Sequence, residues 1–272
     1  MIRLFAFDVH GVFITRILDD PEILGGQKLV DELKRRGYNV AVIASGSNWS
    51  TKEYAARLRS LGFNFDDDEV WPASRVAALH LSRLFGKARC LVLGEPGLVD
   101  ELTGWGHEVV DDWRIAEAVV VGLDRQLTYK KLTDAIRAVH RGAYFLAVNK
   151  VRWYYMPGEG PIASPGAIVA AIEYQTRREA VVVGKPSVVH YYTVLSHFGI
   201  KPEEAVMVGD DVEADLIPAK TVGMKTVLVS SVDRTDKQEA PPKAVDIAIS
   251  HVDELLKYVD NGQLYIMSEK VK

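Results

Sequence analysis

The chain has little cysteine and no long apolar run. Cys90 is the single cysteine among 272 residues, which excludes an intrachain disulfide and any multi-cysteine zinc site and suits a reducing compartment. No apolar run approaches the roughly 20 residues that a membrane-spanning helix requires. The first residues show no secretory signal pattern. We therefore expect a cytoplasmic protein without a membrane partner, and we interpret Cys90 as a buried strand thiol rather than a nucleophile.

The chain also lacks any long block of one charge. It has 33 basic and 37 acidic residues and a net charge of −4. Binding to a nucleic-acid backbone requires a basic patch, so we expect no nucleic-acid partner. The length allows one large domain or two modest ones.

What the sequence does contain is a regular alternation of apolar runs and amphipathic stretches, which is typical of βαβ units around a parallel sheet. Strands are predicted over residues 2–7, 39–44, 89–93, 118–122, 144–149, 180–183, 205–208 and 225–229. Helices are predicted over residues 27–36, 50–61, 128–141, 166–175, 188–198 and 252–259. The predicted fold class is α/β, with a doubly wound, Rossmann-like parallel sheet.

Four polar segments directly follow predicted strands: residues 7–12, 43–46, 184–186 and 209–215. Ligands of an open α/β sheet bind at the carboxyl ends of its strands. An aspartate, a hydroxyl, a lysine and an acidic cluster at that edge make a nucleophile, two phosphate holders and a metal site. No single segment is specific, but their order and spacing together predict phosphoryl transfer.

No such segment lies in the self-contained α/β stretch between the second and third motifs. We interpret residues 78–183 as an inserted α/β cap domain, within a discontinuous core of residues 1–77 and 184–272.

Carboxylates dominate the first and last segments. Asp8 ends its strand beside a turn, where a carboxylate can attack phosphorus and form an aspartyl phosphate; the alternative is a cap for the following loop. Asp210, Asp211, Glu213 and Asp215 lie within six residues. They repel one another unless a cation neutralises them, and Mg²⁺ prefers oxygen ligands together with phosphate. The alternative is a solvated acidic turn.

The two middle segments supply groups for a phosphate. Lys185 can hold a phosphate oxygen and the charge of Asp8 together, although a surface lysine is a common alternative. Ser45 offers a hydroxyl, and Gly46 lies beside it among backbone N–H groups; the alternative is a simple turn serine.

The ordered set Asp…Ser…Lys…Asp-Asp resembles the haloacid dehalogenase (HAD) superfamily of phosphohydrolases. The size and position of the insert narrow the likeness to subfamily IIA, which contains p-nitrophenyl, phosphoglycolate, and sugar- and nucleotide-phosphate phosphatases. Residues 120–124, 157–161, 164–167 and 183–186 also carry this likeness, which covers essentially the whole chain.

The resemblance implies a role for each acidic residue of the motifs. Asp8 would be the nucleophile. Mg²⁺ would be held by the Asp8 carboxylate, the main-chain carbonyl of His10 and the Asp210 carboxylate, with Asp211 and Asp215 in the outer shell of the metal.

The resemblance also implies the remaining parts of the site. Ser45, with Gly46, would orient the phosphoryl group, and Lys185 would neutralise the nucleophile and the phosphate. The cap would close over a small phosphorylated metabolite. A homodimer is compatible with the family, but no feature of the chain establishes it.

The chain departs from the family pattern at three places. Most members carry an acid/base aspartate where this chain has His10; histidine, with a reference pKa of about 6.5, could replace it or leave the enzyme slow. A one-residue shift would put Ala44 rather than Ser45 at the hydroxyl position. In the cap, the run Asn149-Lys150-Val151 lacks the usual acid, and the basic, aromatic residues 152–155 either face the substrate or pack inside the cap.

Three other readings compete with a phosphatase. A catalytically degenerate member would bind a phosphorylated ligand or partner without efficient turnover, and His10 motivates this alternative. A dehalogenase-type hydrolase also lacks the second aspartate, but the intact Asp210 cluster and the large cap argue against it. A receiver domain is half this length and orders its acidic residues differently.

Two further features are expected to be structural. The acidic run at residues 66–69 follows no apolar strand and is interpreted as a solvated loop. His80, His140 and His190 stand singly and not at metal-ligand spacings.

Overall fold

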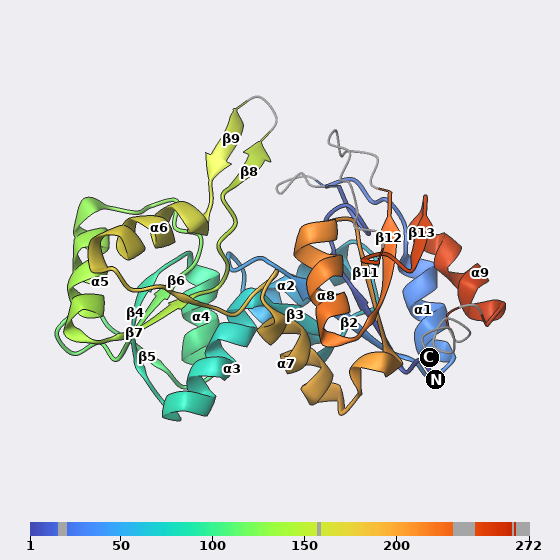
Figure 1. Cartoon of the computed structure of the whole chain (residues 1–272), viewed down its shortest axis with the longest axis horizontal. Coiled ribbons are helices and arrows are strands. Elements are labelled where there is room, and N and C mark those ends of the chain that lie inside the picture. The colour runs from blue at the N-terminus through green and yellow to red at the C-terminus, as the bar shows by residue number, and fades with distance from the viewer. Residues whose placement is uncertain (16–20, 157–158, 231–242, 263, 265–272) are drawn as a thin grey trace. The chain divides into compact units, whose positions relative to one another are not determined.

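A computed structural model describes residues 1–15, 21–156, 159–230, 243–262 and 264 of the chain. The chain divides into two compact units, each built around its own sheet (Figure 1). The first unit comprises residues 1–44, 55–71 and 190–272, and the second comprises residues 45–54 and 72–189.

The first unit contains a six-stranded sheet in the order β13-β12-β11-β1-β2-β3. Its strands are β1 (Leu4–Phe7), β2 (Asn39–Ala44), β3 (Val70–Pro72), β11 (Ala205–Gly209), β12 (Lys225–Val229) and β13 (Ile247–Ile249). The central strand β1 pairs in parallel with both β2 and β11. All four residues of β1 and all five of β11 are buried, which explains why both strands read as continuous apolar runs.

Helices and short turns flank this sheet, with α1 contacting β2 and α8 contacting β12. They are α1 (Gln27–Arg35), α2 (Thr51–Ser60, which begins in the second unit), α7 (Val188–Phe198), α8 (Ile217–Val222) and α9 (Leu255–Asp260). The 3-10 turns are η1 (Asp67–Glu69), η2 (Pro202–Glu204) and η4 (Val252–Glu254), and η3 (Val212–Leu216) is a π-helical turn.

The second unit has a five-stranded sheet in the order β10-β7-β6-β4-β5 and a separate antiparallel hairpin, β8-β9. The strands are β4 (Arg89–Leu93), β5 (Glu108–Val109), β6 (Ala118–Val121), β7 (Tyr144–Ala147), β8 (Trp153–Met156), β9 (Gly160–Ala163) and β10 (Val181–Val182). The helices are α3 (Ala73–Phe85), α4 (Pro96–Gly104), α5 (Tyr129–Arg141) and α6 (Pro165–Thr176). The apolar faces of α5 and α6 pack on this sheet through residues such as Ala135 and Ile172.

The predicted α/β class with parallel sheets and flanking helices is confirmed. The predicted strands 39–44, 89–93 and 225–229 and the helix 188–198 match residue for residue, and most other ends differ by one or two residues. The division into a core of 1–77 and 184–272 and a cap of 78–183 stays a prediction. The compact units instead place residues 45–54, 72–77 and 184–189 in the second unit, and α3 runs through the predicted boundary at 77/78.

The acidic run at residues 66–69 is partly solvated, as interpreted, with Asp66 and Asp68 exposed, but it forms a 3-10 turn rather than an irregular loop. It forms η1, in which Asp66 and Glu69 make a reciprocal capping box. Lys34 pairs with Glu69 at 2.8 Å, and Arg59 pairs with Asp67 at 2.9 Å. These ion pairs and the cap explain why the run is folded although no strand precedes it.

His80, His190 and Cys90, which we interpreted as structural, lie in contact with other parts of the fold. His80 lies 2.8 Å from the hydroxyl of Tyr144, and Nε2 of the fully buried His190 lies 3.0 Å from the carbonyl oxygen of Trp71. Cys90 is buried in β4, and burial raises the pKa of its thiol to about 12, which suits an inert strand thiol. Trp153 of β8 is 56% exposed, so this part of the stretch 152–155 is not packed inside the unit.

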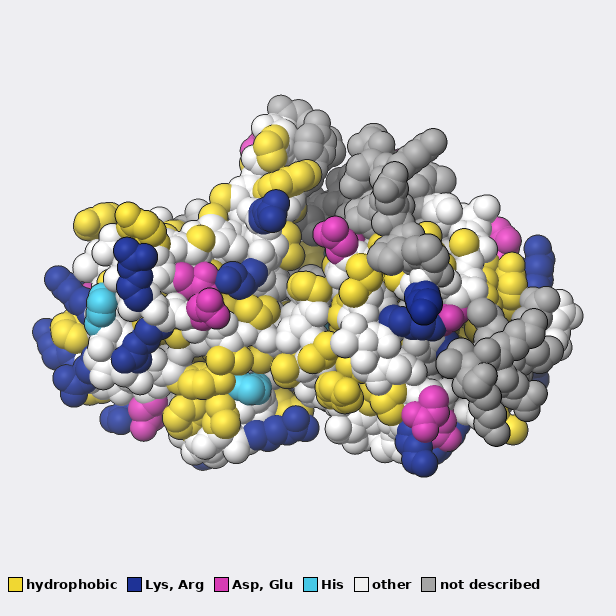
Figure 2. Space-filling model, viewed as in Figure 1, with side chains coloured by type: hydrophobic (Ala, Val, Ile, Leu, Met, Phe, Trp, Pro, Cys, Tyr) yellow, Lys and Arg dark blue, Asp and Glu magenta, His cyan; other side chains and the backbone are white. Residues whose placement is uncertain are grey.

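None of the described helices is long and apolar enough to span a membrane. Figure 2 shows basic, acidic and apolar side chains interspersed on the visible face of each unit.

Candidate active site

The pairing of β1 with β11 brings two distant motifs to the same sheet edge. Phe7 lies opposite Val208 in the register, so Asp8 and Gly209 leave the sheet as neighbours. The N–H of Asp8 donates to the carbonyl of Val208 at 2.9 Å, which continues the ladder by one residue. The first and last motifs, some 200 residues apart in the sequence, therefore meet where parallel strands end.

The loop after Asp8 is closed by its own backbone. The N–H groups of Val12, Phe13 and Ile14 all point to the carbonyl of Val9, at 3.3, 2.9 and 3.2 Å. The ring of Phe13 is fully buried and anchors the loop among Phe7, Phe63 and Phe65, with ring centroids 5.0, 4.9 and 5.9 Å away. Local hydrogen bonds and this aromatic cluster together fix the segment that carries Asp8 and His10.

Gly11 allows the loop to approach the last motif closely. Its φ is +84°, in the left-handed region. A Cβ at this position would lie 2.1 Å from Oδ2 of Asp210, closer than any side chain tolerates. Glycine is thus required here both for the backbone conformation and for the space occupied by the Asp210 carboxylate.

Three carboxylates converge within the first unit. Asp8, Asp210 and Asp215 each offer one oxygen, and these oxygens all lie within 4.8 Å of one another. Asp210 is 3% exposed and Asp215 is 1% exposed, so solvent screens their mutual repulsion poorly. A group of three hard oxygen donors, of which Asp210 and Asp215 are buried, fits a divalent cation such as Mg²⁺.

The carboxylate of Asp211 binds backbone N–H groups of the following turn. One of its carboxylate oxygens accepts the N–H groups of Glu213 at 3.0 Å and Ala214 at 2.9 Å, which caps the turn η3. The N–H of Asp211 in turn donates to Oδ2 of Asp215 at 3.3 Å. A Cβ on Gly209 would lie 2.5 Å from that same oxygen, so the backbone before the turn also needs glycine for close approach. The cluster is therefore held by its own backbone.

Tyr191 of α7 lies against this turn and was not predicted. Its side chain is fully buried, and its hydroxyl donates to the carbonyls of Ala214 at 2.9 Å and Asp215 at 3.0 Å. Burial, followed by the negative charges of Asp215, Asp8 and Asp211, raises the pKa of Tyr191 well above its ordinary value. No sequence signal marks this contact, because it exists only once α7 packs under η3.

The other predicted site residues belong to the second unit. The carbonyl of Ser45 accepts the side-chain N–H of Asn149 at 2.8 Å, and the carbonyl of Gly46 accepts the N–H of Ala73 at 3.1 Å. Lys185 is 2% exposed. The structure thus brings Asp8, Asp210 and Asp215 together, whereas the phosphate-holding roles of Ser45, Gly46 and Lys185 stay predictions. Asn149 has a role that the sequence did not reveal, since it ties the Ser45 loop to the end of β7.

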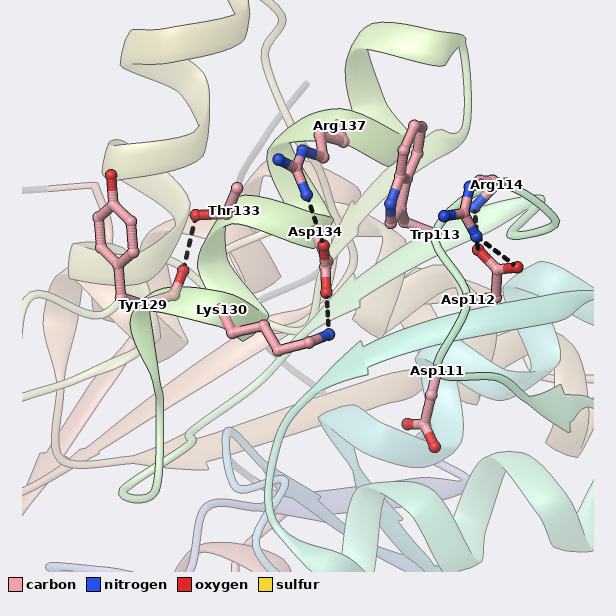
Figure 3. A pocket seen from close by; sticks show the side chains of 9 residues that line it. All are labelled: Asp111, Asp112, Trp113, Arg114, Tyr129, Lys130, Thr133, Asp134 and Arg137. Carbon is pink, nitrogen blue, oxygen red and sulfur yellow. Dashed lines mark hydrogen bonds and ion pairs between the residues drawn. The ribbon is translucent and has the colours of Figure 1, made fainter.

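The second unit also carries a pocket of about 700 Å³ (Figure 3). It lies between α5 and the segment 111–114. Its basic side chains are paired within the pocket, because Lys130 and Arg137 both bind Asp134 and Arg114 binds Asp112. With these cations already neutralised, the pocket offers a phosphate little attraction, and we assign no ligand to it. Pro157 and Gly158 of the predicted cap motif lie outside the described residues.

Comparison with known proteins identifies the family. The chain is 32% identical over 254 residues to human glycerol-3-phosphate phosphatase, covering 84% of this chain and 78% of the relative. The chain belongs to the haloacid dehalogenase-like hydrolases. Residues 5–108 match the model of the haloacid dehalogenase-like hydrolase family, and residues 182–255 match a second, HAD-hydrolase-like model.

Two further relatives of this HAD-like hydrolase define its branch. Phosphoglycolate phosphatase 1A of Arabidopsis thaliana chloroplasts is 29% identical over 267 residues, with 90% of this chain and 73% of the relative covered. The solved p-nitrophenyl phosphatase from Archaeoglobus fulgidus has a TM-score of 0.84 and 30% identity, covering 94% of this chain and 98% of the other. The predicted membership of the HAD superfamily and of its subfamily IIA is confirmed. The chain is thus a HAD-type phosphatase.

Proposed function

We propose that this HAD-like hydrolase is a Mg²⁺-dependent phosphatase that cleaves a small phosphomonoester through an aspartyl phosphate on Asp8. The observation that carries the proposal is the convergence of Asp8, Asp210 and Asp215, with one oxygen from each within 4.8 Å. Three close carboxylates, two of them buried, are costly unless a cation neutralises them, and a phosphate dianion needs the same cation. The named activities of the relatives support the same reaction class.

The residues present fit the metal. Asp8, Asp210 and the main-chain carbonyl of His10 would hold Mg²⁺, and Asp211 and Asp215 would fix the geometry behind these ligands. When bound, Mg²⁺ supplies positive charge that offsets the carboxylates and the phosphoryl oxygens. The hydrogen bonds from the backbone to Asp211 and Asp215 support this division of roles, because they orient the turn independently of the metal.

The chemistry then assigns one task to each side chain. A carboxylate oxygen of Asp8 attacks phosphorus, the ester P–O bond breaks, and the leaving oxygen takes a proton from protonated His10 or from water to give the alcohol. Water then attacks the acyl phosphate and releases inorganic phosphate and the free carboxylate. We propose that Lys185 and Ser45, with the N–H groups near Gly46, hold the phosphoryl oxygens, and that the cap excludes bulk water and selects the leaving group.

The proposed substrate is a small phosphorylated metabolite of the sugar phosphate, phosphoglycolate or nucleotide type. Two relatives are named for phosphoglycolate and glycerol 3-phosphate, both compact phosphomonoesters. The test is a screen of phosphoglycolate, glycerol 3-phosphate, sugar phosphates, nucleoside monophosphates and p-nitrophenyl phosphate with Mg²⁺. Asp8→Asn serves as the blank, and phosphate release above this blank is the expected result.

His10 favours a second candidate function, a degenerate member that binds a phosphorylated ligand without efficient turnover. The family places an acid/base carboxylate at this position, whereas histidine is cationic when protonated and is disfavoured beside a bound metal. His10 lies two residues after Asp8, in the same loop closed by backbone hydrogen bonds.

Restoring the carboxylate separates these functions. We expect His10→Asp to raise the turnover of p-nitrophenyl phosphate by roughly 10- to 100-fold, a part of the ~10²–10⁴-fold that general acid/base catalysis contributes. This ester has an activated leaving group, so hydrolysis of the phosphoenzyme limits its rate and responds to the new base. The measurement is steady-state release of p-nitrophenol by both proteins across neutral pH.

A wild type faster than His10→Asp would show that His10 is an adapted acid/base group, and the rate of the wild type should then vary steeply with pH near neutrality. Inactivity of both proteins on every ester in the screen would favour the ligand-binding function instead. The matched control is His140→Asp on an exposed position of α5, which should leave the rate unchanged.

A further inference from the structure

The turn that follows Asp210 leads into a helix whose second residue cannot donate a backbone hydrogen bond. The π-helical turn η3 runs directly into α8, whose second residue is Pro218. In an α-helical continuation the carbonyl of Ala214 would accept the N–H of residue 218, but proline has none. This α-helical bond is therefore missing at the junction, and a side-chain donor can bind the carbonyl of Ala214 in its place.

Tyr191 supplies that donor. Its hydroxyl reaches the carbonyls of Ala214 at 2.9 Å and Asp215 at 3.0 Å. A hydroxyl has one hydrogen, so the two carbonyls share it as a bifurcated hydrogen bond. The ring is fully buried within the first unit.

The hydrogen bonds of Tyr191 influence the positions of the carboxylates through a short stretch of backbone. Ala214 and Asp215 belong to η3, whose start is capped by Asp211 and whose Asp215 side chain returns to the N–H of Asp211. Asp210 directly precedes this closed turn, and its carboxylate meets those of Asp8 and Asp215. Any displacement of the carbonyls of residues 214 and 215 is thus transmitted to two of the three converging carboxylates.

We propose that Tyr191 is a positioning residue that holds the Asp210–Asp215 turn in the geometry required for divalent cation binding. The inference rests on the proposed function, since it takes the carboxylate group as a Mg²⁺ site. Tyr191 touches neither the reacting atoms nor the ligand oxygens. It acts through the main chain of residues 214 and 215, as outer partners of metal ligands do.

The test compares Tyr191→Phe with Tyr192→Phe. The first variant deletes only the buried hydroxyl, and the second deletes the hydroxyl of a neighbouring tyrosine that is 50% exposed. Isothermal titration calorimetry with MgCl₂ on the substrate-free proteins gives the Kd for Mg²⁺ in each. We expect Tyr191→Phe to raise this Kd about tenfold, at the lower end of what outer partners of metal ligands contribute, and Tyr192→Phe to leave it unchanged.

A second readout guards against a general loss of stability. The gain in Tm on adding Mg²⁺ is measured for each protein, and Tyr191→Phe should gain clearly less than wild type and Tyr192→Phe. At saturating substrate, the rate of Tyr191→Phe should recover when Mg²⁺ is raised. The Mg²⁺ concentration that gives half its maximal rate should therefore increase by a larger factor than its kcat decreases.

The outcomes distinguish the inference from the function on which it rests. Wild type that binds no Mg²⁺ would overturn the proposed function itself. Wild type and Tyr191→Phe with Kd values within twofold would leave the proposed function intact and overturn the inference. A Tyr191→Phe protein that does not fold would assign the hydroxyl to the stability of the whole unit and would also overturn it.

Discussion

Asp8→Asn is expected to lower the turnover of every phosphomonoester by at least about 10³-fold, because removing an enzyme's nucleophile costs several orders of magnitude. An amide oxygen is a poor nucleophile for phosphorus and a weaker metal ligand than a carboxylate. The fold should be unaffected, and Tm without metal should stay equal or rise, since a crowded acidic group loses one charge. Steady-state hydrolysis of p-nitrophenyl phosphate and thermal melts measure both effects.

Asp100→Asn is the matched control for this substitution. Asp100 is an exposed aspartate on α4 of the second unit, and its amide variant should keep the wild-type rate. If Asp8→Asn retained more than a small fraction of the activity while Asp100→Asn was normal, Asp8 would not be the nucleophile. The covalent mechanism would then be wrong even if the protein is a phosphatase.

Chelation is expected to have an effect of similar size. The carboxylates of Asp8, Asp210 and Asp215 lie too close to one another to orient a phosphate dianion without a cation. EDTA should therefore lower the rate by about 10³-fold or more, and excess Mg²⁺ should restore it. Binding also stabilises the folded state, by about 2.7 kcal/mol when free Mg²⁺ is 100 times its Kd.

The measurement is the rate and the Tm in EDTA, then after Mg²⁺ is added back in excess. Na⁺ at matched ionic strength is the control, because screening alone also weakens the repulsion between carboxylates. Full activity in the chelator would contradict the proposed Mg²⁺ dependence and favour a metal-independent mechanism like that of the dehalogenase-type hydrolases.

The sequence predicts those site residues that lie in short contiguous motifs. Asp8 and Asp210 each follow a buried apolar strand, and the rule that parallel strands end at one edge is enough to place them together. The contribution of Gly11 needed the structure, since only coordinates show that a Cβ there would strike the Asp210 carboxylate. Tyr191 and Asn149 were missed for the same reason, as each acts through contacts with residues distant in the sequence.

The missed secondary structure has local causes. Residues 73–78 at the start of α3 are all buried, Ser74 and Arg75 included, so the helix lacks the alternation of polar and apolar faces that identifies amphipathic helices. The strand β5 has two residues and β3 has three, too few for a period to be recognised. The hairpin β8-β9 was missed because the aromatic run 153–155 shows no alternation of polar and apolar residues.

The most direct test of the proposed function is to trap the acyl phosphate. Wild type is mixed with p-nitrophenyl phosphate and Mg²⁺, quenched in acid during turnover and reduced with borohydride, which converts an aspartyl phosphate to homoserine. Peptide mass spectrometry should find this conversion at Asp8, with none in Asp8→Asn or in EDTA. Rapid hydrolysis with no conversion at Asp8, or with conversion at another carboxylate, would contradict the covalent mechanism.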